Sequence, residues 1–359
     1  MKPFSLLLIA IGVSWLLGAC QRQPPLTPQE QTTVNALTSH LKTRCVGRYL
    51  IDMPAEAAIF GTIDVQGVSI EAKAMSMEDY RKAMQARGDE LRATRAWNGY
   101  RFLYADTAID GIPDSHYFVS LGDPRPLTDA ERLVEAYRWD RGYQIKMVMK
   151  ATSAKESVEF KDDPVARDAT YMNDLSAKSQ VVTSLLSRAR GRGDDEIPNE
   201  PGVCFQGGWL VGKPWEQEKV RAQFVPSHHN DVSFDLDTDS SIQESDTLLE
   251  RGGDINEMLH QAHGHTLRKG AVDLTGMHAE EWLASGTTVL KVPGFLFSLE
   301  ANSKNSNSQA PLTILQMDVG SPNRILQASH LEKASLTEGE AVSLWDAISR
   351  TLRPRPNAF

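Results

Sequence analysis

The chain has 359 residues, a formal net charge of −9 and only three cysteines. No block of basic residues interrupts this acidic balance, which argues against nucleic acid as a partner. A chain of this length exceeds the usual size of one domain, so the sequence predicts two domains.

The first 20 residues have the pattern of an export signal. Lys2 precedes the apolar stretch 4–17, which is shorter than the roughly 20 residues that a membrane helix needs. The sequence "LGAC" at 17–20 resembles a bacterial lipobox, in which the cysteine is lipidated and becomes the new N-terminus. We therefore predict a signal peptide over 1–19 and lipidation at Cys20. The alternative is an ordinary cleaved signal in which Cys20 has no role.

An aspartate directly after the lipidated cysteine would indicate retention in the inner membrane, but this position is Gln21. We therefore expect an anchor in the outer membrane and a protein that faces the periplasm. Residues 20–33 are rich in proline and glutamine and have almost nothing to bury, which predicts a tether. In the periplasm, Cys45 and Cys204 are the only remaining cysteines that could form a disulfide. Two buried free thiols are the alternative, because sequence does not give the distance between them.

The first folded unit, 34–192, is predicted to be α+β. Ser76 is a typical N-cap for a helix over 76–94. Alternating apolar residues predict strands on both sides of this helix. The expected order is a strand at 45–52, a hairpin at 61–75, the helix at 76–94, strands at 100–106, 116–122, 132–140 and 142–151, and a helix at 176–190.

A stretch rich in glycine, proline and acidic residues predicts a linker over 193–203, after which a second unit runs from 204 to 359. The expected order is a strand at 204–211, a hairpin over 219–237, a helix at 246–264 that a glycine pair weakens, a strand-rich middle in which 278–285 could be helical, and a final helix at 336–353. Thr337 and Glu340 have the spacing of a capping box at the start of that last helix.

Matching sequences suggest that the second unit repeats the first. The offset between Cys45 and Cys204 nearly equals the offset between "LLSR" at 185–188 and "AISR" at 347–350. This agreement predicts an internal duplication, with chance similarity of short motifs as the alternative. The expected fold is two similar α+β lobes, each a mainly antiparallel sheet with helices packed on one face, and a groove between the lobes.

Few residues in the chain have the pattern of a catalytic site. The sequence contains no G-x-S-x-G elbow, P-loop or dinucleotide-binding fingerprint, so we expect no enzyme activity, cofactor or metal. One alternative is a zinc hydrolase. Its ligands would be His260, His263 and His265, with Asp273 or His278. Histidines at the end of a helix are more often simply solvated.

The run 235–246 is strongly acidic. It places aspartates at positions one, three and five of a calcium-loop pattern, but has serine at six and aspartate at twelve, where glycine and glutamate are usual. Strand alternation would instead point Phe234 and Leu236 inward and the aspartates outward. The run is then a solvated strand end, a calcium site or a patch that attracts a basic protein surface. The candidate residues are Asp235, Asp237 and Asp239.

Two polar loops, 121–131 and 300–311, occupy what we expect to be corresponding positions in the two lobes. Ordinary solvated hairpin loops are the simpler interpretation. If the loops instead grip a partner, the residues expected to contact it are Arg125, Asn302, Lys304 and Asn305.

Three runs resemble a known family: "CVGRYLIDMP" at 45–54, "CFQGGWL" at 204–210 and "FDLDTDSS" at 234–241. They resemble the two-domain lipoprotein family of type VI secretion immunity proteins, the partners of antibacterial lipase effectors. The resemblance covers nearly all of the chain after the tether. It implies a periplasmic protein that clamps a phospholipase between two similar lobes, so that the lid or active site of the phospholipase cannot work. It assigns no individual contact residue.

The residues and the resemblance together predict a periplasmic immunity protein that binds and inhibits a type VI lipase or phospholipase effector. Both lobes are expected to close on the effector, with contacts from the two loops and from the acidic run. The alternatives are an outer-membrane lipoprotein that binds a small ligand or calcium and, behind it, the zinc hydrolase.

Overall fold

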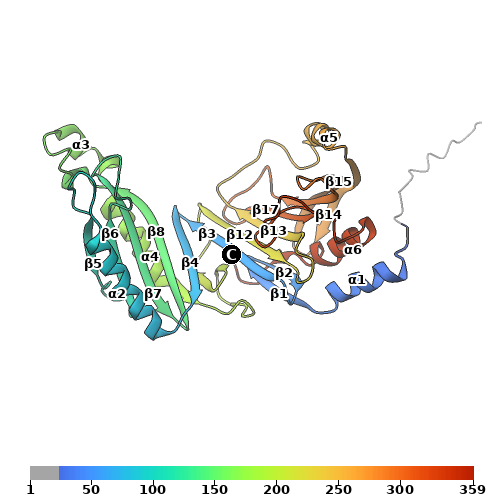
Figure 1. The fold of residues 1–359 in the computed structure, drawn as a ribbon, viewed down its shortest axis with the longest axis horizontal. Coiled ribbons are helices and arrows are strands. Elements are labelled where there is room, and N and C mark those ends of the chain that lie inside the picture. The colour runs from blue at the N-terminus through green and yellow to red at the C-terminus, as the bar shows by residue number, and fades with distance from the viewer. Residues whose placement is uncertain (1–23) are drawn as a thin grey trace, which may run out of the picture.

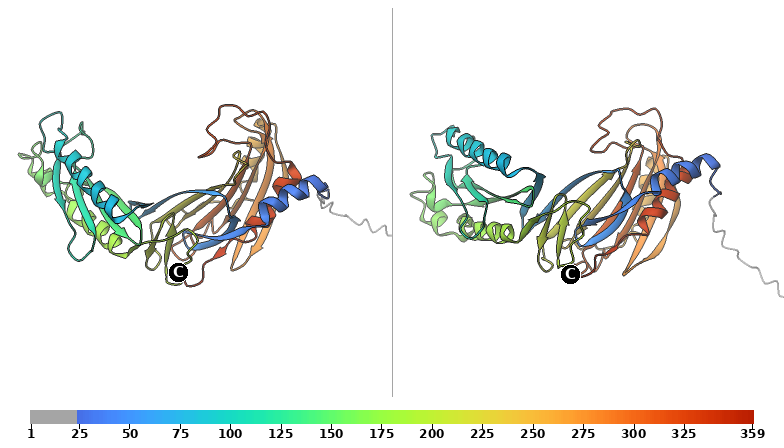
Figure 2. Two further views of the ribbon diagram at one scale, coloured as in Figure 1. Left: turned by 60° about the horizontal axis from the view of Figure 1, so that its bottom comes forward. Right: turned by 90° about the horizontal axis from the view of Figure 1, so that it is seen from below.

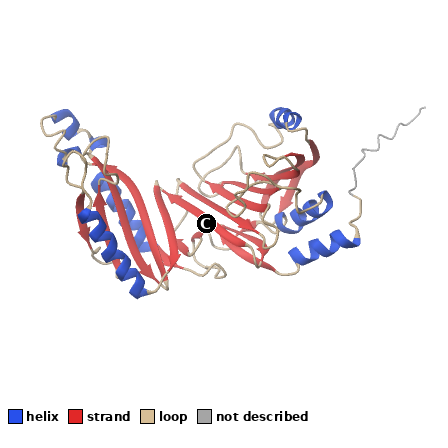
Figure 3. Cartoon of the chain, viewed as in Figure 1, coloured by secondary structure: helices blue, strands red, loops and turns tan. Residues whose placement is uncertain are grey.

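One antiparallel sheet of 12 strands runs through the whole molecule. The structure, a computed structural model, describes residues 24–359. The predicted signal peptide (1–19) and the lipidation site Cys20 lie outside the described residues. The sheet is bent into a saddle whose two arms form a U (Figures 1 and 2). Strands continue from one arm to the other, with helices on both sides (Figure 3).

The two halves of the sheet meet at β3 and β12, which pair antiparallel along eight residues each. The first half contains β3 (Ala58–Val65), β4 (Val68–Ala74), β5 (Leu103–Thr107), β6 (Ser115–Ser120), β7 (Glu131–Asp140) and β8 (Tyr143–Thr152). The second contains β12 (Glu218–Val225), β13 (Val232–Asp239), β14 (His265–Leu274), β15 (Met277–Thr287), β16 (Pro293–Ala301) and β17 (Leu312–Val319).

Both halves have the same topology. From the centre outward the strand orders are β3-β4-β8-β7-β6-β5 and β12-β13-β17-β16-β15-β14. Helices α2 (Met77–Ala93) and α5 (Gly252–Gln261) follow the second strand of each half, and α4 (Leu175–Arg188) and α6 (Glu338–Ser349) follow the last. A duplicated chain would have this order, but the duplication itself stays a prediction.

The α+β class and the mainly antiparallel sheets are confirmed, but the helices do not share one face. Phe118 of β6 packs with α2 through Tyr80, whereas the neighbouring Tyr117 hydrogen-bonds Ser179 of α4 on the other side (2.6 Å). The right-hand view of Figure 2 shows the strands between α2 and α4. Such strands bury both of their faces, so the alternation does not reveal which side a helix covers.

Each cysteine-led run forms a hairpin, not the single strand that the sequence predicts. Gly47 and Gly207 have φ of 57° and 72°, which turns the chain back on itself. The first hairpin is β1 (Leu41–Val46) with β2 (Tyr49–Pro54), and the second is β10 (Gly202–Phe205) with β11 (Gly208–Val211). A Cβ on Gly47 would lie 2.9 Å from the Thr238 hydroxyl, so packing also favours glycine there.

The hairpins interlock the two halves. The first hairpin pairs with β18 (Arg353–Pro354), which ends the second half, and the second pairs with β9 (Ala189–Gly191), which ends the first half. A disulfide joins Cys45 to Cys204. Beside it, the amides of Gly47 and Cys204 each donate to the other's carbonyl, at 2.9 and 2.8 Å. Consequently, buried residues of both halves, among them Leu185 and Trp345, form one continuous core.

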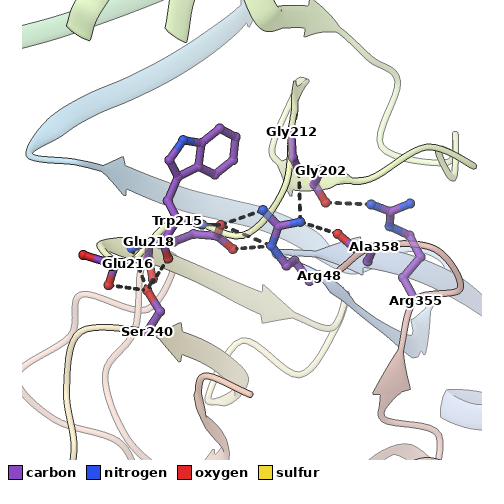
Figure 4. Close-up of polar contacts among 9 residues, drawn as sticks. All are labelled: Arg48, Gly202, Gly212, Trp215, Glu216, Glu218, Ser240, Arg355 and Ala358. Atoms are coloured by element: carbon purple, nitrogen blue, oxygen red, sulfur yellow. Dashed lines mark hydrogen bonds and ion pairs between the residues drawn. The ribbon is translucent and has the colours of Figure 1, made fainter. Parts of the chain in front are cut away.

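A buried arginine holds this joint together (Figure 4). Arg48, 1 % exposed, donates from Nε and Nη2 to the carboxylate of Glu218, at 2.9 and 2.8 Å. Its Nη1 donates to the carbonyls of Gly212 and Ala358. The guanidinium of Arg48 therefore links the first hairpin to β12 of the sheet and to the C-terminal residues.

Two more buried arginines fix the segment 193–203, which the sequence predicts to be a linker. Arg192 donates to the carbonyl of Glu196 at 2.6 Å, and Arg355 donates to those of Pro198 and Gly202 at 2.6 Å each. Arginine presents several donors in a rigid fork, which suits it to binding several carbonyls of an irregular segment. This segment is therefore packed against the protein.

The chain becomes helical before the predicted end of the tether at 33. Helix α1 (Pro28–Thr38) begins within the segment 20–33 and buries Val34 and Leu37. Thr27 and Glu30 form a capping box, and Pro28 is well suited to the first helical position. The segment rich in proline and glutamine therefore also contains the start of a helix. No helix among residues 24–359 is long and apolar enough to cross a membrane.

Two expectations for the second half are corrected. Residues 278–285 are part of β15 and are not helical, because their apolar residues alternate between two buried faces. The helix predicted at 246–264 starts only at Gly252, since Leu249 is held against β15 by a hydrogen bond from its amide to Glu280 (2.8 Å). The remaining helical pieces are α3 (Pro164–Asp168) and 3-10 turns at Ala154–Glu156 and Thr170–Met172.

The joint gives a stability prediction. Replacing Arg48→Met should lower the free energy of unfolding by about 3–5 kcal/mol, because it leaves the Glu218 carboxylate buried without a partner. The double variant Arg48→Met, Glu218→Met should recover most of this loss. Urea unfolding at neutral pH with the disulfide intact measures both, and a double variant no more stable than the single one would contradict the assignment.

Candidate binding face

The open side of the U is lined by one face of the 12-stranded sheet, here called the concave face. The hairpins, α4, α6 and the C-terminus cover the other face (Figure 2). On β13, Phe234 and Leu236 are fully buried in the core, so Asp235 and Asp237 point to the concave face, as the alternation predicts. Helices α2 and α5 lie over the concave face, one in each arm. The loop after β17 reaches the face near its centre, where the amide of Arg324 donates to the side chain of Gln223 at 2.9 Å. The neighbouring part of the centre, at Thr62 and Arg221, is uncovered.

Charged and amide side chains occupy the centre of the concave face. Asp235 accepts from the Gln223 amide at 2.9 Å, and Arg221 lies 3.3 Å from Asp237. Partial burial raises the pKa of both aspartates, although their partners act in the opposite direction. The face is therefore a polar surface whose charges are incompletely solvated, which suits it to bind a complementary surface.

The calcium interpretation of the acidic run is not supported by this geometry. Residues 232–239 form an extended strand, whereas a calcium loop must wrap its oxygens around an ion. Asp239 is only 7 % exposed and pairs with Lys219 (3.1 Å) and Ser241, contacts that together hold its pKa below the ordinary value despite burial. Of the three aspartates, Asp239 is thus an internal structural group.

The zinc ligands considered above do not come together. His260 lies in the last turn of α5 and His265 begins β14, whereas Asp273 pairs with His278 at the other end of β14, roughly 25 Å away at strand rise. Within residues 24–359, no three His, Cys, Asp or Glu side chains are grouped as a metal would require.

The two polar loops do not occupy corresponding positions. Loop 121–130 joins β6 to β7, and its topological counterpart is the β15–β16 connection, whereas loop 302–311 corresponds to the tight β7–β8 turn. Because the two halves pair antiparallel, equivalent strands run in opposite directions, and equivalent loops lie at opposite ends of the strands. Loops 121–130 and 302–311 are not equivalent, and both lie at the same end of the strands, one in each arm.

Residues of these loops differ in their freedom to contact a partner. Arg125 and Asn305 are exposed, and Lys304 is exposed but pairs with Glu250 at 3.1 Å. Asn302 is a turn residue, with φ of 64° and its amide bonded to the carbonyl of Pro311 at 3.0 Å.

A groove beneath α5 went unrecognised in the sequence. It has a volume of about 730 Å³ and lies between the helix and the concave face of β15–β17. Its floor includes Asp318, whose pKa burial and the nearby Asp235 raise to about 6. The alternation of β17 could have placed Asp318 on this face, but no pattern in the sequence shows that α5 leaves its apolar side partly open.

Comparison with known families identifies the chain. The model for the Tle cognate immunity protein 4 N-terminal domain matches residues 42–192, and the model for the C-terminal domain of the same family matches 196–357. The chain belongs to the Tle cognate immunity protein 4 family. The resemblance seen in the sequence is thereby confirmed, including its two-domain type.

Solved structures share the fold of this immunity protein over 89 % of its length. Apo TplEi, a type VI secretion immunity protein from Pseudomonas aeruginosa, is 22 % identical with a TM-score of 0.68 over 98 % of its chain. The crystal structure of the Tle4–Tli4 complex matches at 21 % and 0.70 over 99 %. TplEi complexed with "L" peptide matches at 22 % and 0.64 over 99 %. No curated protein matches the chain in sequence.

The raised pKa of Asp318 gives a prediction about stability and pH. Because the folded-state pKa exceeds the unfolded value, ionised Asp318 costs stability, and this cost appears as pH rises through about 6. Asp318→Asn should therefore raise the free energy of unfolding by about 2 kcal/mol at pH 7.5 and by only a small fraction of that at pH 4.

Asp195→Asn is the control of opposite sign, since hydrogen bonds from Lys42 and the charge of Arg44 lower the pKa of Asp195. It should lose stability at pH 7.5. Urea titrations at the two pH values compare the variants, and an Asp318→Asn protein less stable than the wild type at pH 7.5 would refute the prediction.

Proposed function

We propose that this protein binds a type VI secretion lipase effector on its concave face and thereby inhibits the lipase. Membership of the Tle cognate immunity family supports the kind of partner. The observation that carries the location is the partly uncovered centre of the sheet, where Arg221, Asp235 and Asp237 face the open side. Inhibition of this kind needs a complementary surface and no catalytic group, so we propose that the protein is not an enzyme.

The saddle holds the effector without closing its arms, which revises the closing clamp expected from the sequence. The halves share a continuous sheet, one core and the Cys45–Cys204 disulfide. A surface that is already in its bound shape loses little conformational entropy on association. The arms therefore hold the effector through a complementary shape and not through movement.

Contacts are proposed at the centre and at one rim of the concave face. Asp235 and Asp237 lie at the centre, and Arg125, Lys304 and Asn305 project from the loops on the rim. Exposed charges at such a rim steer the approach of a partner more than they add affinity. Asn302 and Asp239 instead maintain the shape of the loop and the strand end.

We further propose that the protein works in the periplasm, anchored to the outer membrane through Cys20. Helix α1 packs beside α6 on the outer side of the second arm, so the first described residues lie outside the U (Figure 1). Cys20→Ser should shift the protein from the membrane fraction to the soluble periplasmic fraction. An unchanged distribution would argue against the anchor.

The binding proposal is tested with the lipase encoded beside the gene of this protein. The purified mature protein should bind this lipase and suppress its hydrolysis of phospholipid. Thr62→Arg, which adds a large charge at the centre of the concave face without breaking an ion pair, should weaken binding at least tenfold, as expected for the well-packed centre of an interface.

Thr32→Arg on the exposed side of α1 is the matched control and should bind like the wild type. If the wild-type protein neither binds nor inhibits the lipase, the function is wrong. If Thr62→Arg binds as well as Thr32→Arg, the function stands and the concave face is the wrong surface.

A further inference from the structure

The groove beneath α5 has about twice the volume of the hollow beside α2 in the other arm, 730 against 350 Å³, although the two helices hold equivalent places in the topology. Helix α2 is packed onto the sheet and buries Tyr80, Met84 and Leu91. Helix α5 buries no residue at all. Its apolar residues only partly cover a small cluster of Leu248, Trp282 and Ala284, and the groove lies beside this cluster.

Contacts at both ends of α5 tie it to the sheet. Arg251, just before the helix, forms an ion pair with Glu300 of β16. Just after the helix, the carbonyl of Ala262 accepts from the amide of Thr287 at 2.9 Å. Between these ends, Ile255 and Leu259 pack against a small buried cluster that includes Trp282 of β15, and they also form one wall of the groove.

The walls of the groove are apolar and partly open to solvent. Ile255, Met258 and Leu259 line it from α5, at the spacing of one helical face. Met258 is 60 % exposed, and Leu296 on the opposite strand is 47 % exposed. A concave apolar surface of this kind, exposed on the side that faces a partner, is typical of an interaction site.

The floor of the groove carries an unmatched negative charge. Asp318 lies near Ser321 and Asp235. Within the described part of the chain, no Lys, Arg or His nitrogen forms an ion pair with Asp318, whereas Glu300 at the edge of the groove has Arg251. An occupant with a cation would provide the missing partner.

We propose that this groove is a subsite for one segment of the effector, an apolar segment that carries a lysine or arginine. The apolar side chains fill the space between α5 and β16, and the cation pairs with Asp318. The inference rests on the proposed function and specifies which part of the partner lies in this arm.

Photo-crosslinking from the groove identifies the occupant. A photoreactive amino acid in place of Met258 is irradiated in the complex with the neighbouring lipase, and the linked lipase peptide is sequenced. An apolar peptide with a lysine or arginine is expected. A photoreactive amino acid in place of Ile197, in the 193–203 segment and 36 % exposed, is the control and should link no peptide.

Binding variants test the two parts of the subsite separately. Leu296→Asp should weaken binding to the lipase at least tenfold, while Ile197→Asp should not. Asp318→Asn should also weaken binding, by about tenfold, although this variant is predicted to be more stable at neutral pH. Weaker binding by a more stabilised protein cannot be attributed to misfolding.

The outcomes separate this inference from the proposed function. If the lipase binds but the Met258 probe links no peptide or only polar acidic ones, or if Leu296→Asp and Asp318→Asn both bind normally, the subsite is wrong while the function stands. If the lipase does not bind the wild-type protein, both are wrong.

Discussion

The contact between Arg48 and Glu218, with the disulfide beside it, is the constraint on which the rest of the structure depends. Burying two opposite charges is favourable only when both are fully hydrogen-bonded, and here Arg48 also satisfies the carbonyls of Gly212 and Ala358. The contact ties the first hairpin to the central strand of the second half. Because this contact lies in the core that both halves share, the core fixes the angle between the two arms.

A fixed angle explains why the concave face can remain open. The interlocked hairpins support the opposite face of the 12-stranded sheet along its centre. The protein can then leave Asp235, Asp237 and Asp318 incompletely solvated on the open side. We interpret the resulting cost in stability, which the raised pKa of Asp318 reflects, as the cost of keeping a surface ready for a partner.

The sequence predicted those features that local patterns determine. Alternation located nearly every strand of the sheet, and the caps at Ser76 and Thr337 located two helices. It could not give the partners of β9 and β18, because strands of two or three residues pair through contacts distant in sequence. Nor could it show the groove beneath α5: the same amphipathic pattern fits a helix that buries its apolar face on the sheet, like α2, and one that leaves this face partly open, like α5.

The central claim is that a rigid saddle receives the effector without closing. Spin labels at Val165→Cys, in α3 of one arm, and Asp273→Cys, at the exposed end of the other, report the distance between the arms in the oxidised protein. Double electron–electron resonance should give one narrow distance distribution that is the same with and without the lipase. A broad distribution in the free protein that narrows and shortens on binding would contradict the account.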